Sequence, residues 1–264
     1  MLPFIQLPDW HIGPVPIHGF GLLVAIGVLL GTYLARRRAE QKGIAPDLFD
    51  SFLGWTLIGG FIGAHVLDTL FYHPEEIASR PWSLLFVWEG LSSFGGFIGS
   101  IAGGALWKRR HPEAPSLLAL ADSYFAVFPI AWTFGRAGCA VVHDHPGIAA
   151  TSRSLLAVAF PGGPRYDLGL LEMLFSLVLA IAFAATWRRK LPLGFYVAAI
   201  SLCYAPGRFG LDFLRIRTGE GSDPRYLGLT PAQWACIALA AFGVWLAARI
   251  AGRPATAAEP PGER

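Results

Sequence analysis

Charged residues are scarce in this sequence. Only 15% of its 264 residues are charged, while 54% are hydrophobic, and an average soluble domain carries about 25% charged residues. This deficit argues against a soluble globular domain and favours an integral membrane protein. The chain has only three cysteines, Cys139, Cys203 and Cys236. All three lie in apolar stretches, so a disulfide framework is not expected.

Long apolar runs are abundant by contrast, and each of seven is close to the roughly 20 residues that span a bilayer. We therefore predict an all-α polytopic membrane protein with seven transmembrane helices. The pentapeptide GGFIG occurs at 59–63 and 95–99, and we interpret both copies as small-residue helix packing rather than a ligand cradle. The seven spans are expected at 18–35, 50–72, 84–107, 117–142, 168–187, 193–214 and 231–250.

Basic clusters follow the first, third, fifth and seventh of these runs. By the positive-inside rule these ends are cytoplasmic, so the N-terminus is expected outside and the C-terminus in the cytoplasm. Residues 1–253 then form a single membrane domain with an outward loop at 143–167, and 254–264 form a disordered cytoplasmic tail. The clusters comprise Arg36, Arg37, Arg38 and Lys42; Lys108, Arg109 and Arg110; Arg188, Arg189 and Lys190; and Arg249 and Arg253.

Two arginines lie inside apolar runs, where a central arginine costs about 3 kcal/mol. Arg136 lies in FPIAWTFGRAGCAVV, and Arg208 lies in YAPGRFGLDFLR, one helical turn before Asp212. A structural ion pair between Arg208 and Asp212 is one interpretation. One aspartate cannot neutralise both arginines, however. A phospholipid head group is the expected further anion, because the guanidinium fork matches two phosphate oxygens.

Four further ionisable residues lie in or beside apolar runs. Glu89 and Glu172 are carboxylates that lie either within the bilayer or at its interface. His65 and Asp68 are about one turn apart in the second span, and we interpret them as a local structural pair.

The segment GRAGCAVVHDHPG contains the densest group of polar side chains, His143, Asp144 and His145. We expect no metal here, because three adjacent residues seldom all face one ion and no fourth ligand has suitable spacing. General acid–base catalysis is the functional interpretation, and a solvated loop is the alternative. Cys139 has no base at helical spacing, so we interpret it as a packing residue.

Four stretches together resemble the prolipoprotein diacylglyceryl transferases. PIHGFGLLVAIGVLLG is similar to the family's first helix, and FVWEGLSSFGG to its W-x-G-G-x-S-x-H-G-G motif, one residue shorter. FGRAGCAVVHDHPG is similar to the signature G-R-x-G-N-F-x-N-x-E-x-x-G, and YAPGRFGLDFLR to Y-G-x-x-R-F-x-x-E-F-x-R. The four occur in the family's order over nearly the whole chain.

The resemblance implies a set of site residues. The catalytic set would comprise Arg136, Arg208, Asp144, His143 and His145, with Asp144 standing where the signature has glutamate. Glu172 matches the end of the family's H-P-S-Q-L-Y-E stretch, and Asp212 replaces a glutamate of the fourth motif. The substrate-binding set would comprise Tyr204, Asp212, Glu172, Gly135, Gly138, Gly147 and Arg215.

The family moves diacylglyceryl from phosphatidylglycerol to the thiol of a lipobox cysteine. The resemblance therefore implies a multi-pass enzyme of the bacterial inner membrane with no cofactor, acting on an anionic phospholipid and a pre-lipoprotein signal peptide, not on nucleic acid. Four positions depart from the family, namely Phe20, Phe94, Cys139 and Val142. Because each removes a polar group, a catalytically inactive phospholipid-binding relative and a transferase with another acceptor remain alternatives. A transporter would show inverted repeats, which we do not find.

Overall fold

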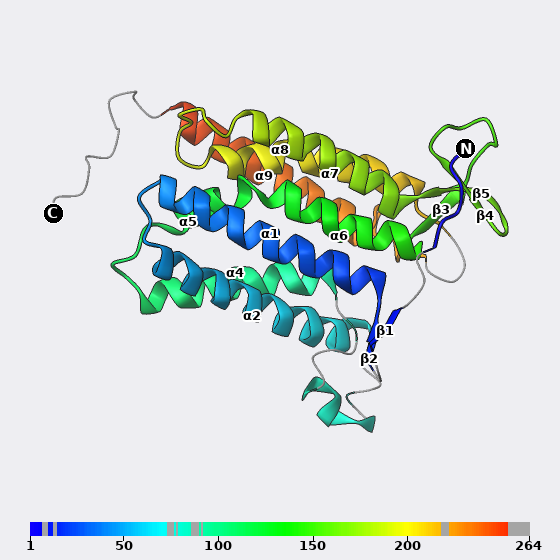
Figure 1. Cartoon of the computed structure of the whole chain (residues 1–264), viewed down its shortest axis with the longest axis horizontal. Coiled ribbons are helices and arrows are strands. Elements are labelled where there is room, and N and C mark those ends of the chain that lie inside the picture. Colours follow the sequence, from blue (N-terminus) through cyan, green and yellow to red (C-terminus); the bar gives the residue numbers. More distant parts are fainter. Residues whose placement is uncertain are drawn as a thin grey trace. The chain divides into compact units, whose positions relative to one another are not determined.

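The computed structural model describes residues 1–6, 10–12, 15–72, 77, 79–85, 90, 92–217 and 222–252. This part of the chain is mostly helical, as predicted, and Figure 1 labels its elements. Its contacts form two compact units, residues 36–121 and residues 1–35 with 122–264. The predicted disordered tail, 254–264, and Glu89 lie outside the described residues.

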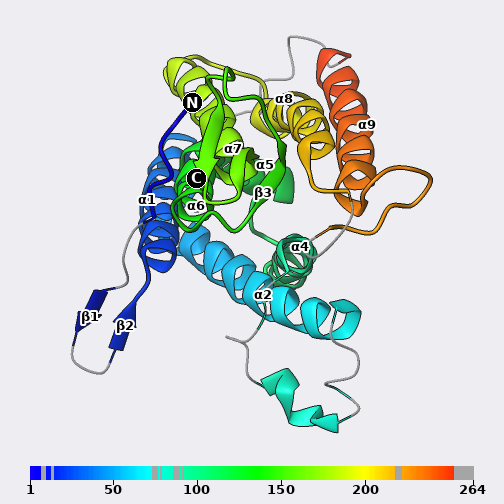
Figure 2. The ribbon, with the colours of Figure 1, turned by 90° about the vertical axis from the view of Figure 1, so that its right-hand side faces the viewer.

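In the unit 36–121, helices α2 (Pro46–Tyr72) and α4 (Ser93–Arg110) lie side by side (Figure 2). Glycines lie where the two helix backbones come closest. A Cβ atom on Gly99 would lie 2.1 Å from the carbonyl oxygen of Gly59, and one on Gly63 would lie 2.6 Å from the carbonyl oxygen of Gly95. Only glycine allows two helix backbones to approach this closely. The packing interpretation of both GGFIG segments is therefore confirmed.

A short 3-10 helix, η1 (Pro81–Leu85), contacts the same unit through His65 of α2. The His65 side chain is buried, and its Nε2 atom lies 3.0 Å from the carbonyl oxygen of Ser83. His65 therefore has a structural partner in η1, outside its own helix, and the histidine is part of the packing of this unit.

The other unit holds the remaining spans. Helices α6 and α7 lie side by side, and so do α8 and α9 (Figures 1 and 2). Helix α1 packs closely on α6, because a Cβ atom on Gly31 would lie 2.8 Å from the Ala131 Cβ. The helices are α1 (Gly19–Gln41), α5 (Leu117–Phe125), α6 (Phe128–Val142), α7 (Leu168–Ala185), α8 (Phe195–Leu211) and α9 (Pro231–Ala251).

Three predicted spans differ from the structure. The run 84–107 begins in η1, and its helix α4 starts only at Ser93. The run 117–142 is not one helix, because α5 and α6 meet at a bend of 55°. Pro129 lies in the first turn of α6, where a missing N–H is tolerated. The run 193–214 ends as α8 at Leu211 and continues as the 3-10 helix η2 (Asp212–Leu214).

The all-α prediction missed two small antiparallel sheets. Within the predicted outward loop, β3 (Pro146–Ala149), β4 (Ala157–Phe160) and β5 (Gly163–Asp167) form a sheet of order β3-β5-β4. Val158 pairs with Arg165 in its register. A hairpin joins β1 (Trp10–Ile12) to β2 (Val15–Ile17). The larger sheet directly follows α6 and directly precedes α7, so it fixes the ends of both helices (Figure 1).

The helices have the properties of membrane spans. Among the described residues, α1, α2, α7 and α9 are long and apolar enough to cross a bilayer, and the bent pair α5–α6 makes a fifth candidate. Large apolar side chains are exposed on them, including Ile181 at 63% and Ile58 at 63%. Exposed apolar surface on this scale is typical of a lipid-facing protein. The chain is therefore a multi-pass membrane protein.

Candidate functional site

Glu172 of α7 lies between the two arginines that the sequence placed in apolar runs. Its Oε1 atom is 3.3 Å from Nε of Arg136 on α6, and its Oε2 atom is 3.7 Å from Nε of Arg208 on α8. Glu172 is buried, and both arginine side chains are 13% exposed. The structure thus brings three predicted site residues together. It also supplies a counter-ion that the sequence argument had assigned to a bound lipid.

Two aromatic residues hold this carboxylate and one of its arginines. The Tyr204 hydroxyl donates a hydrogen bond to Glu172, and Trp132 Nε1 donates to the Tyr204 hydroxyl at 3.1 Å. The guanidinium of Arg136 lies over the Trp132 ring, 4.6 Å from its centroid. Such a cation–π contact fixes a guanidinium without using its hydrogen-bond donors.

Each of the two guanidinium groups has N–H donors that make no hydrogen bond within the described residues. Nη1 of Arg136 contacts Cys139 Sγ at 3.8 Å, and Nη1 of Arg208 donates to Asp212 at 2.7 Å. Within the described part of the chain, neither Nη2 atom makes a hydrogen bond. Each arginine can therefore donate to a further anion while it remains paired with Glu172.

Asp212 is an anchor for other side chains rather than an open ligand. Its side chain is fully buried, pairs with Arg208 and lies 3.0 Å from Nε of Arg215. The hydroxyl of Thr230, the N-cap of α9, also donates to Asp212. Arg215 in turn pairs with Asp223. The predicted substrate-binding residues Asp212 and Arg215 thus form a network that holds Arg208 in place.

The three predicted site glycines differ in their surroundings. A Cβ atom on Gly138 would lie 3.0 Å from the Phe20 ring, and one on Gly147 would lie 2.7 Å from the Leu214 carbonyl oxygen. Both positions need glycine for close packing. Gly135 has open space beside it, because a Cβ atom added there would have nothing within 4 Å. The side chain of Phe94 lies outside the described residues.

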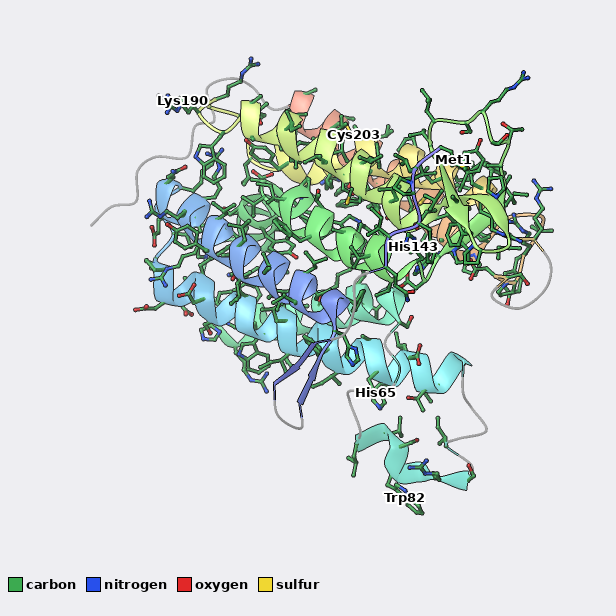
Figure 3. All side chains as sticks on the ribbon, turned by 45° about the vertical axis from the view of Figure 1, so that its right-hand side comes forward. Met1, His65, Trp82, His143, Lys190 and Cys203 are labelled. Atoms are coloured by element: carbon green, nitrogen blue, oxygen red, sulfur yellow. The ribbon has the colours of Figure 1, made fainter. Side chains whose placement is uncertain are left out.

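The predicted cluster of His143, Asp144 and His145 divides into two parts. His143 ends α6 in a left-handed conformation, with φ of 53°. Its Nδ1 atom pairs with buried Asp167, and its Nε2 atom lies 3.1 Å from the carbonyl oxygen of Ile5. Figure 3 labels His143 at the end of α6. Its ring also stacks on Phe4. Both nitrogens of His143 thus have partners, and 8% of its side chain is exposed, so it lies apart from the Asp144–His145 pair.

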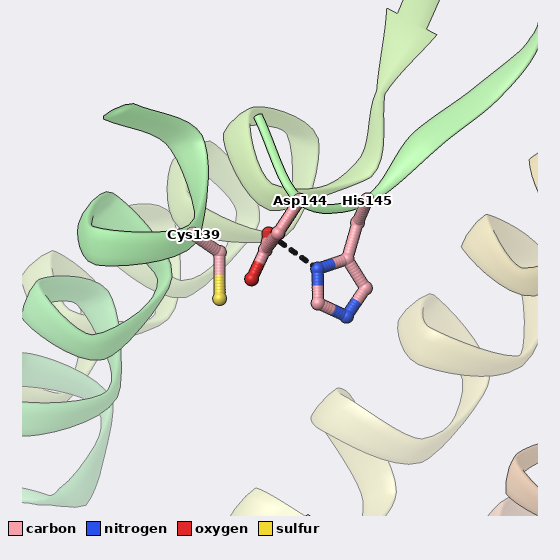
Figure 4. Close-up of side chains that lie close together, drawn as sticks. All are labelled: Cys139, Asp144 and His145. Atoms are coloured by element: carbon pink, nitrogen blue, oxygen red, sulfur yellow. Dashed lines mark hydrogen bonds and ion pairs between the residues drawn. The ribbon is translucent and has the colours of Figure 1, made fainter. Parts of the chain in front are cut away.

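Asp144 and His145 point elsewhere, toward Cys139. His145 Nδ1 lies 2.5 Å from Asp144 Oδ1, and the Cys139 thiol interacts with the same carboxylate (Figure 4). The Asp144 and His145 side chains are 38% and 32% exposed. The Asp144 carboxylate lies between the thiol and the imidazole. These side chains form a polar group beside Arg136, because Cys139 contacts both.

Several supporting residues were not predicted from the sequence. Trp132 lies four residues before Arg136, at the spacing of a helical side-chain pair. Asp167 caps the N-terminus of α7, and Thr230 with Gln233 forms a capping box on α9. The two caps are local signals and can be found in sequence by their positions directly before apolar runs.

The chain is similar to known proteins over most of its length. The family model for prolipoprotein diacylglyceryl transferase matches residues 9–249. The phosphatidylglycerol–prolipoprotein diacylglyceryl transferase of Nitratidesulfovibrio vulgaris (strain Miyazaki F) is 31% identical, over 96% of this chain and 95% of its own length. The enzyme of the same name from Chromohalobacter salexigens is 30% identical, over 89% of this chain and 88% of its own. This chain belongs to the prolipoprotein diacylglyceryl transferase family.

Proposed function

We propose that this protein transfers diacylglyceryl from phosphatidylglycerol to the cysteine thiol of a pre-lipoprotein signal peptide. The observation that carries the proposal is the pair of guanidinium groups around Glu172, each with an Nη2 donor available. Glycerol phosphate is the leaving group of this transfer, and cations placed in advance stabilise the charge that develops on its phosphate. The relatives named for the same reaction support the proposal.

The reaction has two chemical tasks, stabilising the departing phosphate and ionising the acceptor thiol, and they fall on separate groups. Arg136 and Arg208 bind the phosphate and stabilise it as it departs. Glu172, Tyr204 and Asp212 hold these arginines in position. The Asp144–His145 pair, with Cys139, is the group that takes part in ionising the acceptor thiol, because only the thiolate is nucleophilic. His143 has no part in this chemistry.

The proposed setting is the bacterial inner membrane. We further propose seven spans, with α4 and α8 as the two beyond the five candidates, the N-terminus outside and the C-terminus in the cytoplasm. Residues 1–253 would form one membrane domain. In support, α4 ends with Lys108, Arg109 and Arg110, as the positive-inside rule requires of a cytoplasmic end. Reporter fusions after Arg38, Arg110 and Lys190 test this orientation, and periplasmic activity at any of them would refute it.

One observation favours a second candidate, a phospholipid-binding relative without turnover. The Phe20 ring occupies the surface of Gly138, and phenylalanine has no donor or acceptor to offer there. In that case the arginines would bind the lipid head group without transfer. A transferase with a different acceptor would keep the lipid chemistry and lose only the lipobox peptide.

The decisive experiment is reconstitution of the full chain in phosphatidylglycerol vesicles with a fluorescent lipobox peptide, followed by a gel shift. We expect Arg136→Gln to lower the transfer rate by about a hundredfold to a thousandfold, as for loss of one transition-state donor. Arg249→Gln is the control, because Arg249 of α9 contacts only the Trp245 ring in the described structure. Full activity of Arg136→Gln would refute the phosphate role. Lipid binding by the wild type without transfer would establish the second candidate.

A further inference from the structure

The group at the end of α6 joins three kinds of side chain that the proposed phosphate chemistry does not use together. One ligand atom each of Cys139, Asp144 and His145 lies within 4.8 Å of the other two. Figure 4 shows the thiol and the imidazole on either side of the carboxylate. The group therefore contains a sulfur, an oxygen and a nitrogen that converge on one small volume.

This donor set matches the preferences of Zn²⁺. Zinc binds cysteine sulfur, histidine nitrogen and carboxylate oxygen at about 2.0 to 2.3 Å. In a tetrahedral site these bonds place the ligand atoms within about 4 Å of one another. The observed limit of 4.8 Å is close enough for side-chain rotation alone to close the site. Three protein ligands leave the fourth position open, as in catalytic zinc sites.

The three side chains differ in burial, and this difference shapes the position that they surround. Arg136 Nη1 also lies 3.8 Å from the Cys139 sulfur. Cys139 is buried, whereas the Asp144 and His145 side chains are 38% and 32% exposed. An ion held by all three would therefore have protein on its sulfur side and an accessible face on the other.

We propose that Cys139, Asp144 and His145 hold one Zn²⁺ ion whose open position binds the acceptor thiol. The site stands by itself, whereas its role rests on the proposed transferase function. A thiol that coordinates zinc is deprotonated, and its proton passes to solvent on the accessible face. The sulfur then forms a bond to the glyceryl carbon as the bond from that carbon to the phosphate oxygen breaks. The leaving group, glycerol phosphate, departs with that electron pair on its phosphate oxygen beside Arg136 and Arg208, and zinc keeps its oxidation state.

The convergence of these three side chains replaces the expectation of no metal, which rested on the contiguous triplet from His143 to His145. That triplet cannot converge on one ion, because His143 pairs with Asp167 instead. Cys139 takes the third place, since it lies on the last turns of α6 and faces Asp144. The cysteine that departs from the family signature is thus the residue that completes the site.

Metal content tests the site without reference to activity. The full chain is purified in detergent, stripped with a chelator, dialysed against Zn²⁺ or Co²⁺ and analysed by mass spectrometry. We expect about one zinc ion per chain, and a thiolate-to-cobalt charge-transfer band in the Co²⁺ form. Cys139→Ser and His145→Ala should lose the ion, and Cys139→Ser should lose the band. Cys203→Ser, at an exposed cysteine of α8, should keep both.

Fold failure is separated from loss of the site by melting curves. Zinc should raise the melting temperature of the wild type and of Cys203→Ser, because a ligand bound only by the folded state stabilises it. The Cys139→Ser and His145→Ala proteins should still melt cooperatively, without this rise. Equal zinc content in all variants, or none in the wild type, would overturn the site.

The role is tested by transfer assays on stripped and zinc-reloaded protein. We expect the rate to fall with the zinc content and to return on reloading. If stripped protein transfers at the full rate, the metal role is wrong, the transferase function stands, and Asp144–His145 acts as a simple base. If the protein holds zinc but transfers no diacylglyceryl, both the proposed role of zinc and the proposed transferase function are wrong, whereas the zinc site itself stands.

Discussion

The α2–α4 contact and the α6–α7–α8 cluster join helices by opposite means. The first brings the backbones together through glycines such as Gly59 and Gly99, and its Arg110 lies over the Trp55 ring at the end of α4 without a buried ion pair in the described residues. The second joins its helices through buried ions, with Glu172 between Arg136 and Arg208. Close packing is sufficient to associate helices in lipid, so the glycine contact needs no ion pair to hold the two helices together. Buried charges cost free energy, and their presence in the second region is the reason for proposing the site there.

The largest stability effect should come from the charged region, with Asp212→Asn. Removing one partner from a buried ion pair leaves the other uncompensated and typically costs about 3 to 5 kcal/mol. Asp212 is fully buried and holds both Arg208 and Arg215. Thermal melting in detergent measures the loss. Asp223→Asn is the matched control, because that partner of Arg215 is 37% exposed and an exposed pair contributes about 1 kcal/mol or less. Equal losses in both variants would show that Asp212 is not the anchor.

The second-largest loss of stability is expected in the glycine contact between α2 and α4, with Gly99→Ala. The added methyl group would meet the Gly59 carbonyl oxygen at 2.1 Å, so α2 and α4 must move apart. Overpacking of this kind costs about 1 to 3 kcal/mol, and we expect the upper end because backbone atoms are the obstacle. The control is Gly54→Ala on α2, which has nothing within 4 Å and should gain about 0.5 to 1 kcal/mol from helix propensity. A destabilised Gly54→Ala protein with an unchanged Gly99→Ala protein would contradict the contact.

The smallest loss of stability is expected for His143→Ala. Comparing it with His145→Ala separates a structural from a chemical role in the charged region. His143→Ala removes a hydrogen bond to buried Asp167, and a bond to a charged group contributes about 1.5 to 3 kcal/mol. We expect a loss of about 2 kcal/mol with the transfer rate nearly unchanged below the melting temperature. His145→Ala should do the reverse, with little change in melting and a loss of transfer. A large rate loss in a well-folded His143→Ala protein would return His143 to the mechanism.

Apolar length predicted some helices closely and others poorly. The predicted runs 168–187 and 231–250 correspond to α7 and α9 within two residues at each end, whereas the predicted run 84–107 begins nine residues before α4 does. The run 117–142 failed for a local reason. Hydropathy continues through the bend between α5 and α6, and hydropathy does not report backbone direction. The small sheet was missed because its strands are short and irregular in pattern.

The sequence by itself determined that this is a helical membrane protein with two arginines in apolar surroundings. Apolar length and charge placement are properties of the chain, and the bilayer acts on them directly. Only the tertiary structure decided the partners. Glu172 neutralises Arg136 and Arg208 from another helix, and Cys139 joins Asp144 and His145 while His143 turns away to Asp167. Sequence spacing cannot supply these pairings, because side chains from separate elements meet only where packing brings their helices together.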